Sequence, residues 1–405
     1  MQKGNLLFAQ SGGPTAVINA SAAGVIAAAQ KSGAYDKILC AHYGMDGILK
    51  EDFLNASQMT KKQLKLLADT PASAFGSCRF KLPAYETDSS VYEKLLAIFQ
   101  KHNVSTFVYN GGNDSMDTCH KVAEYFKKIG YDCKVVGVPK TVDNDLAGTH
   151  HCPGFGSAAK FVATNVEEIA LDTAVYEKGR ITICEVMGRD AGWLTASSIV
   201  ATCHGNGPDL IYLPEAPFDT DKFFQQAIEV YNQKKRCLVA LSEGIRDKKG
   251  NYVGAPVGTK DSFNHTQLGG VAAYLADCLT QKFGIKTRAI EFSLPTRAAG
   301  HIASLADQKD ALTCGKYAVK LALNGETGVM VTMDRQKGAT VCGSLDLGKI
   351  ANEVRTVPQE YITNDGSNIS EKFLDYVLPL IDGEVRLDYK DGIPVYFDSS
   401  VLPKA

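Results

Sequence analysis

The chain of 405 residues is long enough for two domains of ordinary size. Hydrophobic residues make up 45% and charged residues 22% of it, which is the composition of a soluble globular protein and excludes a disordered or collagen-like chain. Its 43 basic and 45 acidic residues give a formal net charge of −2, so the chain lacks the positive charge typical of proteins dedicated to nucleic acids or anionic membranes.

The eleven cysteines are scattered singly, with no Cys-x-x-Cys pair and no spacing typical of a zinc site. This pattern predicts reduced thiols and a cytoplasmic protein. The first apolar run ends at Gly12 and is too short for a secretory signal, and no apolar stretch approaches the ~18 residues of a membrane-spanning helix. We therefore expect neither a membrane nor a nucleic acid as a partner.

The chain begins with short apolar strands that alternate with helices. A strand is expected at residues 5–9, a tight loop at 11–15 and a helix at about 16–30. A second strand at 106–109 leads through the glycine-rich stretch 110–115 into another helix. Each of these is a strand, loop and helix in that order.

A third strand, at 134–138, runs into the polar loop 139–145. Because alternating strands and helices form parallel sheets with right-handed crossovers, all three loops are expected at the carboxyl edge of one sheet. Open α/β sheets bind ligands at that edge. The first domain is therefore predicted to carry a ligand site made of three loops.

The same pattern restarts near residue 157, after a stretch rich in Gly, Pro and His at 148–156 that suits a hinge. The expected elements are helices that end at 171 or begin at 191 and 219, and strands at 180–186, 210–213 and 238–241. The chain is therefore predicted to be an α/β protein with two doubly wound, Rossmann-like, mostly parallel sheets. Beyond Pro358 the sequence indicates only weak strand-like structure that caps the fold.

A glycine pair follows each of the first two strands, at Gly12-Gly13 and at Gly111-Gly112. Such a pair lets backbone N–H groups turn toward an anion at the start of a helix, which favours phosphate. Taken alone, Gly12-Gly13 is better explained as a plain tight turn.

The second glycine pair is followed by Asn113, Asp114 and Ser115. A carboxylate beside a bound phosphate repels it unless a cation lies between them, and Mg²⁺ uses one or two carboxylates and completes its shell with water and phosphate oxygens. The alternative is that Asp114 and Ser115 only cap the helix. The two interpretations are balanced until the third loop is considered.

The third loop carries Lys140, Thr141, Asp143 and Asp145 close together. A turn explains the neighbouring Pro139, but it does not explain a lysine and two carboxylates. One carboxylate can serve a metal and the other a substrate hydroxyl. Phosphoryl transfer uses this division, with Mg²⁺ and Lys neutralising charge and an Asp accepting the proton of the attacking hydroxyl.

In the second domain, Met187, Gly188 and Arg189 follow directly on a predicted strand. Arginine can pair bidentately with phosphate, and glycine lets the backbone approach a ligand. The alternative interpretation places Trp193 in the core and Arg189 in a surface ion pair. Further candidates, each of which could equally be a solvated charge, are Glu243, Arg79, Arg180, Arg288 and Arg297.

The stretches 111–115 (GGNDS), 139–145 (PKTVDND) and 187–189 (MGR), in this order, resemble the phosphofructokinase family. The resemblance runs from Ser11 to Arg297. It implies a kinase that phosphorylates the 1-hydroxyl of fructose 6-phosphate, with the active site in the cleft between two α/β domains.

The resemblance also implies how the chain is divided. The phosphoryl-donor domain comprises residues 1–155, with about 298–350 returning to it. The sugar-phosphate domain comprises 156–297, with about 351–405 packing on it.

The resemblance implies a role for each matching residue. Asp143 is the base for the sugar hydroxyl, Arg189 and Lys140 assist the transfer, and Asp114 and Asp145 hold Mg²⁺, with Asn113 as a further candidate. Donor binding is implied for Gly12, Gly13, Arg79, Gly112, Asn113, Asp114, Ser115 and Lys140. Binding of fructose 6-phosphate is implied for Thr141, Asp143, Arg180, Met187, Gly188, Arg189, Glu243, Arg288 and Arg297. In the family Arg180 and Arg288 come from a neighbouring subunit, which implies a homodimer or homotetramer.

Two positions indicate the phosphoryl donor. Members that use ATP carry glycine where this chain has Asp114 and Lys140, whereas members that use inorganic pyrophosphate carry Asp and Lys. A side chain there fills the space of an α-phosphate, and the lysine supplies charge to a compact anionic donor. The sequence thus resembles the pyrophosphate-dependent branch, whose reaction is readily reversible and belongs to glycolysis and gluconeogenesis.

Two alternatives remain at this point: an ATP-dependent 6-phosphofructokinase, and a non-catalytic sugar-phosphate-sensing subunit of the same fold. Asp114 with Lys140 argues against the first, and a base beside a metal site argues against the second. The sequence departs from the family pattern twice. Asn113 stands where many members have aspartate, and Leu294 stands where many short bacterial members have a histidine for the sugar phosphate.

Overall fold

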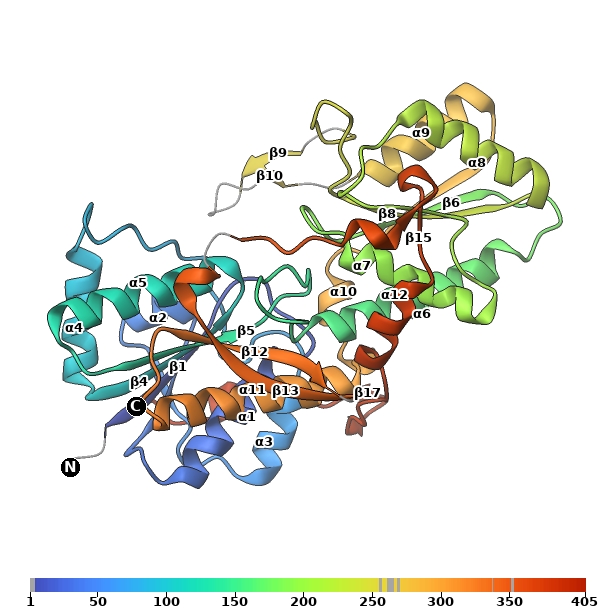
Figure 1. Cartoon of the computed structure of the whole chain (residues 1–405). Helices are drawn as coiled ribbons and strands as arrows, with labels where there is room; N and C mark the ends of the chain where they lie inside the picture. The colour runs from blue at the N-terminus through green and yellow to red at the C-terminus, as the bar shows by residue number, and fades with distance from the viewer. Residues whose placement is uncertain (1–3, 255–256, 261–265, 268–269, 337, 351–352) are drawn as a thin grey trace.

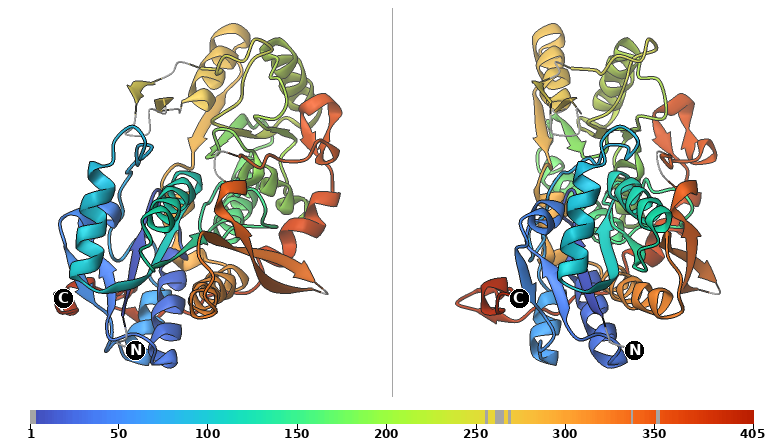
Figure 2. Two further views of the ribbon diagram at one scale, coloured as in Figure 1. Left: turned by 60° about the vertical axis from the view of Figure 1, so that its left-hand side comes forward. Right: turned by 90° about the vertical axis from the view of Figure 1, so that its left-hand side faces the viewer.

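The computed structural model describes residues 4–254, 257–260, 266–267, 270–336, 338–350 and 353–405. It contains two α/β units that lie next to each other, each built on its own sheet (Figure 1). Both views in Figure 2 show the same division. The two-domain α/β architecture expected from the sequence is confirmed.

The first unit is a seven-stranded sheet with the order β13-β12-β5-β4-β1-β2-β3. Its centre consists of three parallel neighbours: β1 (Asn5–Gln10), β4 (Val104–Gly111) and β5 (Lys134–Pro139). These are the three strands predicted from the apolar runs. Because they are parallel and adjacent, their carboxyl ends lie at one edge, as expected.

Helices cover both faces of this sheet, because successive residues of a strand face opposite sides. Leu6 and Phe8 pack with α1 (Ile18–Ser32) and α11 (Leu305–Leu323), whereas Leu7 packs on the opposite face. That opposite face is covered by α2 (Gly44–Leu49), α4 (Ser90–Lys101) and α5 (Asn113–Ile129). The sheet is thus buried on both sides, as a doubly wound fold requires.

The helices α1 and α11 approach so closely that glycine is needed at their contact. A Cβ on Gly24 would lie 2.3 Å from the carbonyl oxygen of Leu312, and one on Gly315 would lie 2.0 Å from that of Ser21. Both distances are far below a van der Waals contact. The returning helix α11 therefore belongs to the core of the first unit.

The second unit is a four-stranded parallel sheet with the order β11-β6-β8-β7. Its strands are β6 (Ile181–Val186), β7 (Leu210–Tyr212), β8 (Cys237–Ser242) and β11 (Thr287–Glu291). One face packs against α6 (Phe155–Thr173), α7 (Trp193–Ala196) and α12 (Lys372–Val377), and the other against α8 (Thr220–Lys234) and α9 (Val271–Phe283). The helix expected from residue 191 is a single α-turn that continues as a 3₁₀ helix, Ser197–His204.

The sequence did not anticipate several short or peripheral elements. The first sheet is extended by β2 (Ile38–Ala41), β3 (Phe53–Asn55) and the antiparallel hairpin of β12 (Val329–Gln336) and β13 (Ala339–Asp346). The remaining α-helices and β-strands of the described residues are α3 (Lys61–Ala68), α10 (Pro295–Ala298) and the pairs β9 (Val257–Lys260) with β10 (Thr266–Gln267), β14 (Ile362–Thr363) with β15 (Asn368–Ile369), and β16 (Tyr389–Lys390) with β17 (Ile393–Pro394).

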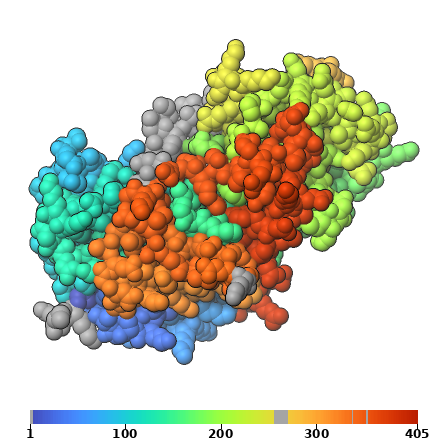
Figure 3. All heavy atoms as spheres, viewed as in Figure 1, coloured from blue at the N-terminus to red at the C-terminus, as the bar shows by residue number. Residues whose placement is uncertain are grey.

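The C-terminal segment, residues 353–405, runs from the first unit to the second and then returns to the first. In Figure 3 its orange and red atoms extend across both units on one face. Residues of α12 pack in the second unit, but the amide of Asn55 donates to the carbonyl of Pro403 (2.8 Å), and the amide of Ala405 donates to that of Phe53 (3.0 Å). The expected boundary, with all of 351–405 on the second domain, therefore differs at the end of the chain. The tail covers the edge strand β3, whose backbone groups would otherwise lack partners.

Candidate active site

A cavity of about 500 Å³ lies where loops of the two units meet. It is lined by Gly12, Gly13, Pro14, Arg79, Gly112, Asn113, Asp114, Ser115, Lys140, Thr141, Val142, Asp143, Asp145, Met187, Arg189, Asp190, Ala191, Glu243, Arg297 and Val354. The three loops of the first unit and the segment after β6 of the second all contribute. Four basic side chains among these residues, from both units, make the cavity suitable for a phosphorylated ligand.

Most of the residues singled out from the sequence line this cavity. Gly188 is adjacent to it, since its amide donates to Glu243 Oε1 (3.3 Å). Arg180 and Arg288 are not part of it: Arg180 precedes β6 and pairs with Asp172, and Arg288 is an exposed residue of β11. The lining residues that the sequence reasoning missed are Pro14, Val142, Asp190, Ala191 and Val354. The first four lie next to predicted residues, but Val354 had no local signal.

The first glycine pair makes room for cations. A Cβ on Gly12, whose φ is +75°, would lie 3.2 Å from Lys140 Nζ, and one on Gly13 would lie 2.8 Å from Arg297 Nη1. Lys140 Nζ donates to the carbonyl oxygen of Gly13 (2.7 Å). The absence of side chains at this loop therefore lets two positive groups approach the same backbone.

The second glycine pair leads into α5, whose N-cap is Gly112. No side chain caps this helix, so the alternative in which Asp114 or Ser115 is the cap is wrong. Asn113 Nδ2 donates to Asp145 Oδ2 (3.0 Å), and Asn113 Oδ1 is buried without a hydrogen-bond partner. A helix N-terminus without a side-chain cap, next to an unpartnered oxygen and two carboxylates, is suited to a metal-bound anion.

The third loop brings buried charges together. Lys140 is 3% exposed, and burial lowers its pKa to about 8. Burial, with the charges of Asp145 and Glu243, raises the pKa of Asp143 to about 7, although Lys140 and Arg189 oppose the rise. Asp143 Oδ1 is buried and has no hydrogen-bond partner. The loop thus presents a basic carboxylate oxygen, ready to accept a proton, beside an ammonium group.

The second unit contributes an arginine from the segment after β6. Gly188 has a φ of +140°, and Ser242 Oγ donates to its carbonyl oxygen, which holds the turn against β8. Arg189 lines the cavity, and its Nε is buried without a partner. Trp193 is a core residue, as one interpretation had it. The surface ion pair that this interpretation gave to Arg189 is wrong, because Arg189 faces the cavity.

The residues fit a magnesium ion bound together with a phosphate. Among the described residues there is no cluster of three or more His, Cys, Asp or Glu that would hold a metal unaided. Mg²⁺ needs only one or two carboxylates when phosphate oxygens and water complete its shell. Asp114 and Asp145 line the cavity and carry carboxylates of this kind, and the unpartnered Asn113 Oδ1 is a third oxygen of the type that Mg²⁺ prefers.

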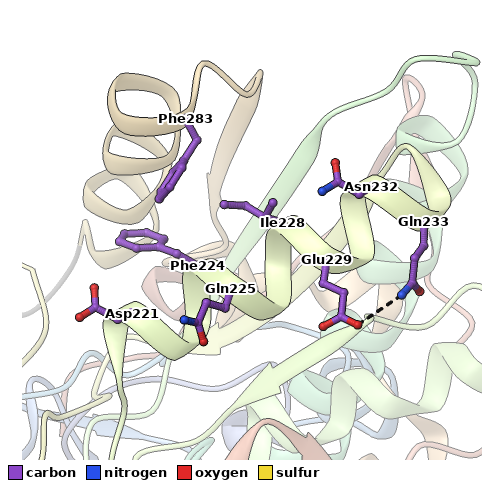
Figure 4. Close-up of a pocket in the computed structure, with 8 residues that line it drawn as sticks. All are labelled: Asp221, Phe224, Gln225, Ile228, Glu229, Asn232, Gln233 and Phe283. Atoms are coloured by element: carbon purple, nitrogen blue, oxygen red, sulfur yellow. Dashed lines mark hydrogen bonds between the residues drawn. The ribbon is translucent and has the colours of Figure 1, made fainter.

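A second depression lies between α8 and α9 (Figure 4), with a volume of about 830 Å³. Figure 4 shows the rings of Phe224 and Phe283 close together, with centroids 5.6 Å apart, and Gln233 bonded to Glu229 along α8 (3.4 Å). Its lining contains two acidic side chains and no basic one. This surface therefore does not suit a phosphorylated ligand.

No helix in the described part of the chain is both long and apolar enough to cross a membrane.

Comparison with known proteins gives consistent results. Residues 5–322 match the model of the phosphofructokinase family. The chain is 44% identical to a pyrophosphate–fructose 6-phosphate 1-phosphotransferase of Xanthomonas campestris pv. campestris, over 98% of this chain and 96% of that protein. A protein of the same name from Halomonas elongata is 40% identical, over 97% and 96%. The crystal structure of a pyrophosphate-dependent phosphofructokinase from Marinobacter aquaeolei superimposes with a TM-score of 0.88 at 37% identity, covering 99% of this chain and 97% of that one.

Proposed function

This chain belongs to the phosphofructokinase family, and from that premise we propose that it is a pyrophosphate-dependent phosphotransferase. It converts fructose 6-phosphate and inorganic pyrophosphate to fructose 1,6-bisphosphate and phosphate, and it catalyses the reverse reaction. The observation that carries the proposal is the position of Lys140 and Asp114 in the cavity. Relatives at 40–44% identity bear the name of this activity.

The donor end of the cavity suits a small anion. Lys140 Nζ bonds to Gly13, next to the bare backbone of Gly12, and Asp114 lies in the first turn of α5. These two side chains occupy space that a nucleotide would need, and the ammonium attracts the concentrated charge of pyrophosphate. Gly112 and Ser115 at the start of α5 and Arg79 complete the proposed donor site.

Asp143 is the proposed general base. Its unpartnered Oδ1 accepts the proton of the 1-hydroxyl of the sugar as the hydroxyl oxygen attacks the nearer phosphorus of pyrophosphate. The bond from that phosphorus to the bridging oxygen breaks, and inorganic phosphate leaves. The raised pKa of Asp143 makes it a stronger base than an exposed aspartate.

Arg189 and Lys140 face the transferring group from opposite units and offset its negative charge. The side chains that we assign to the sugar are Thr141, Met187, Glu243 and Arg297, together with Gly188, which holds Glu243 in place. When bound, Mg²⁺ neutralises charge on the phosphates, and Asp114, Asp145 and Asn113 are the residues that would hold it.

Arg180 and Arg288 are proposed to bind the 6-phosphate in the cavity of a second copy. They lie outside the cavity of their own chain, and Arg180 Nε is buried without a partner. A phosphorylated sugar with no arginine at its phosphate would be held weakly. We therefore propose that the enzyme is a homodimer or homotetramer of two-domain chains. Because all its cysteines are free thiols, we also propose that it acts in the cytoplasm.

The proposal is tested by assaying the purified protein with fructose 6-phosphate and Mg²⁺, with pyrophosphate or ATP at matched concentrations. We expect turnover with pyrophosphate and little or none with ATP. Turnover with ATP alone would keep the family but contradict the donor. Absence of turnover with both donors, combined with specific binding of fructose 6-phosphate, would instead favour the sensing subunit.

A further inference from the structure

The residue between the proposed base and the proposed metal ligand has an unusual backbone conformation. Asn144 is fully buried and has a φ of +57°, in the left-handed region. The two neighbouring carboxylates interact with different units of the chain. Asp145 accepts a hydrogen bond from Asn113 of the first unit. The charges of Glu243 and Arg189, which belong to the second unit, act on Asp143. Only Asn144 separates the two residues, so its backbone conformation sets how their carboxylates are oriented relative to each other.

The side-chain oxygen, the side-chain nitrogen and the carbonyl oxygen of Asn144 all have hydrogen-bond partners. Its Oδ1 accepts from the amide of Cys152 (2.9 Å), and its Nδ2 donates to the hydroxyl of Tyr376 (2.7 Å). Its carbonyl oxygen accepts from Arg355, from Nε at 3.2 Å and from Nη2 at 2.9 Å. Two of these partners come from the C-terminal segment, more than 200 residues further along the chain.

Arg355 closes the loop that follows Asn144. Its Nη1 donates to the carbonyl oxygen of His150 (2.5 Å), and its backbone amide donates to the carbonyl oxygen of Asp145 (2.8 Å). The guanidinium therefore binds both ends of the segment 144–150. Lysine, with a single ammonium on a flexible stem, cannot reproduce this planar pattern.

Arg355 also joins this loop to the other half of the site. Its guanidinium lies over the indole of Trp193, 4.3 Å from the ring centroid, and Trp193 Nε1 donates to its carbonyl oxygen (2.9 Å). Trp193 begins α7, in the segment that carries Arg189. Arg355 thus lies between the segment of the proposed base and the segment of the arginine opposite it.

Tyr376 uses its full hydrogen-bonding capacity on the same groups. Its hydroxyl accepts from Asn144 Nδ2 and from Arg355 Nη2 (3.1 Å), and it donates to the carbonyl oxygen of His150 (2.8 Å). Its ring packs near Trp193, with the centroids 5.1 Å apart. The hydroxyl of Tyr376 therefore links the side chain of Asn144, the guanidinium of Arg355 and the backbone of His150.

We infer that Arg355 and Tyr376 are positioning residues that hold the turn at Asn144 and thereby set Asp143 against Arg189. Both lie beyond residues 5–322, the part that matches the family model. The inference rests on the proposed function, because it assigns the C-terminal segment a part in that reaction. Neither residue lines the cavity, so each acts through Asn144 and the backbone around it.

The test uses Tyr376→Phe and Arg355→Lys in the full-length chain, with Tyr212→Phe as the matched control. Tyr212 is a buried tyrosine of the second unit, whereas Tyr376 packs partly buried against the core of the same unit. The hydroxyl of Tyr212 bonds only to Gln226 (2.8 Å) among the described residues, and Tyr212 does not line the cavity. All three changes keep the bulk of the side chain. The wild-type and variant chains are assayed with pyrophosphate and fructose 6-phosphate, and their thermal transitions and amide hydrogen exchange are measured without substrate.

We expect kcat to fall about tenfold to a hundredfold in Tyr376→Phe and Arg355→Lys, the scale of a displacement of roughly 1 Å at a reacting group. KM for either substrate should change less than about threefold, since the binding side chains are untouched. Amides of residues 141–152 should exchange faster in both variants. Tyr212→Phe should leave kcat and this exchange unchanged. It should lower the temperature of the thermal transition about as much as Tyr376→Phe and Arg355→Lys do.

An unchanged kcat in Tyr376→Phe and Arg355→Lys, or an equal loss in Tyr212→Phe, would overturn the inference. So would unchanged exchange over 141–152. A wild-type chain that does not turn over with pyrophosphate would contradict the proposed function instead. In that case the exchange measurement still decides whether the two residues hold the turn.

Discussion

The cavity has a proposed donor side and a proposed sugar side. A single chain provides all the residues proposed for the donor side, but only some of those proposed for the sugar side. On the donor side, the loops after β1, β4 and β5 supply glycines, a buried lysine and the acidic residues from adjacent strands of one sheet. On the sugar side, one chain supplies Arg189, Glu243 and Arg297, whereas Arg180 and Arg288 lie outside the cavity of their own chain. We therefore expect the choice of phosphoryl donor to depend on a single chain, and the affinity for fructose 6-phosphate to depend on the oligomer.

The largest expected effect on turnover comes from Asp143, which lies between the donor side and the sugar side of the cavity. Asp143→Asn should lower kcat by about 10² to 10⁴, because the general base is lost. The raised pKa of Asp143 means that its charge is poorly stabilised in the folded chain at neutral pH. The thermal transition of the variant should therefore be equal to or higher than that of the wild type. Turnover within a factor of two of the wild type would exclude Asp143 as the base.

Substitutions of Arg180 and Arg288, which we propose to act in the cavity of a second copy, should affect only the use of fructose 6-phosphate. Arg180→Met and Arg288→Met should each lower kcat/KM for fructose 6-phosphate by about tenfold to a hundredfold, the usual range for losing a charge-assisted hydrogen bond. KM for pyrophosphate should stay within about twofold. Steady-state kinetics with each substrate varied in turn provides the measurement. An equal loss for both substrates would show that the two sides are not separable in this way.

Substitution of Asp114, on the donor side, should affect the use of pyrophosphate and not the use of fructose 6-phosphate. Asp114→Gly should weaken pyrophosphate use by about tenfold, or roughly 1.4 kcal/mol, and the double change with Lys140→Gly should begin to admit ATP. Asp117→Gly is the control, because Asp117 lies on the same helix and pairs with Lys121 instead (2.6 Å). If pyrophosphate kinetics do not respond to Asp114→Gly, the assignment of the donor loses its structural basis.

The smallest effect is a pH dependence of donor binding. Burial lowers the pKa of Lys140 to about 8. The ammonium is charged below that pKa and becomes neutral above it, so kcat/KM for pyrophosphate should fall as pH rises above about 8, whereas Lys140→Met should lack this decline. Because both enzymes meet the same ionisation states of pyrophosphate, the difference between their profiles isolates Lys140. Parallel profiles would show that Lys140 does not titrate in this range.

The sequence predicted the central strands and the three donor loops because each is local: an apolar run, a glycine pair and a polar stretch follow one another. Asp143, Lys140 and Arg189 could be found for the same reason. The roles inferred for Arg355 and Tyr376 could not, because their contacts with Asn144 span 211 and 232 residues and arise only from packing. The strands β2 and β3 have only four and three residues, too few for a period to show. The end of the chain is held against β3 by backbone hydrogen bonds, which leave no mark in the sequence.

Whether two chains share one sugar site can be tested directly by coexpressing two impaired variants, Asp143→Asn and the double variant Arg180→Met with Arg288→Met. In a mixed oligomer, the chain that carries Asp143→Asn lends its arginines to a cavity of the other chain, which retains Asp143. We predict that pyrophosphate-dependent activity in the mixed preparation rises well above the sum of the two variants prepared separately. Activity that equals that sum, in an oligomer shown to contain both chains, would contradict the shared site.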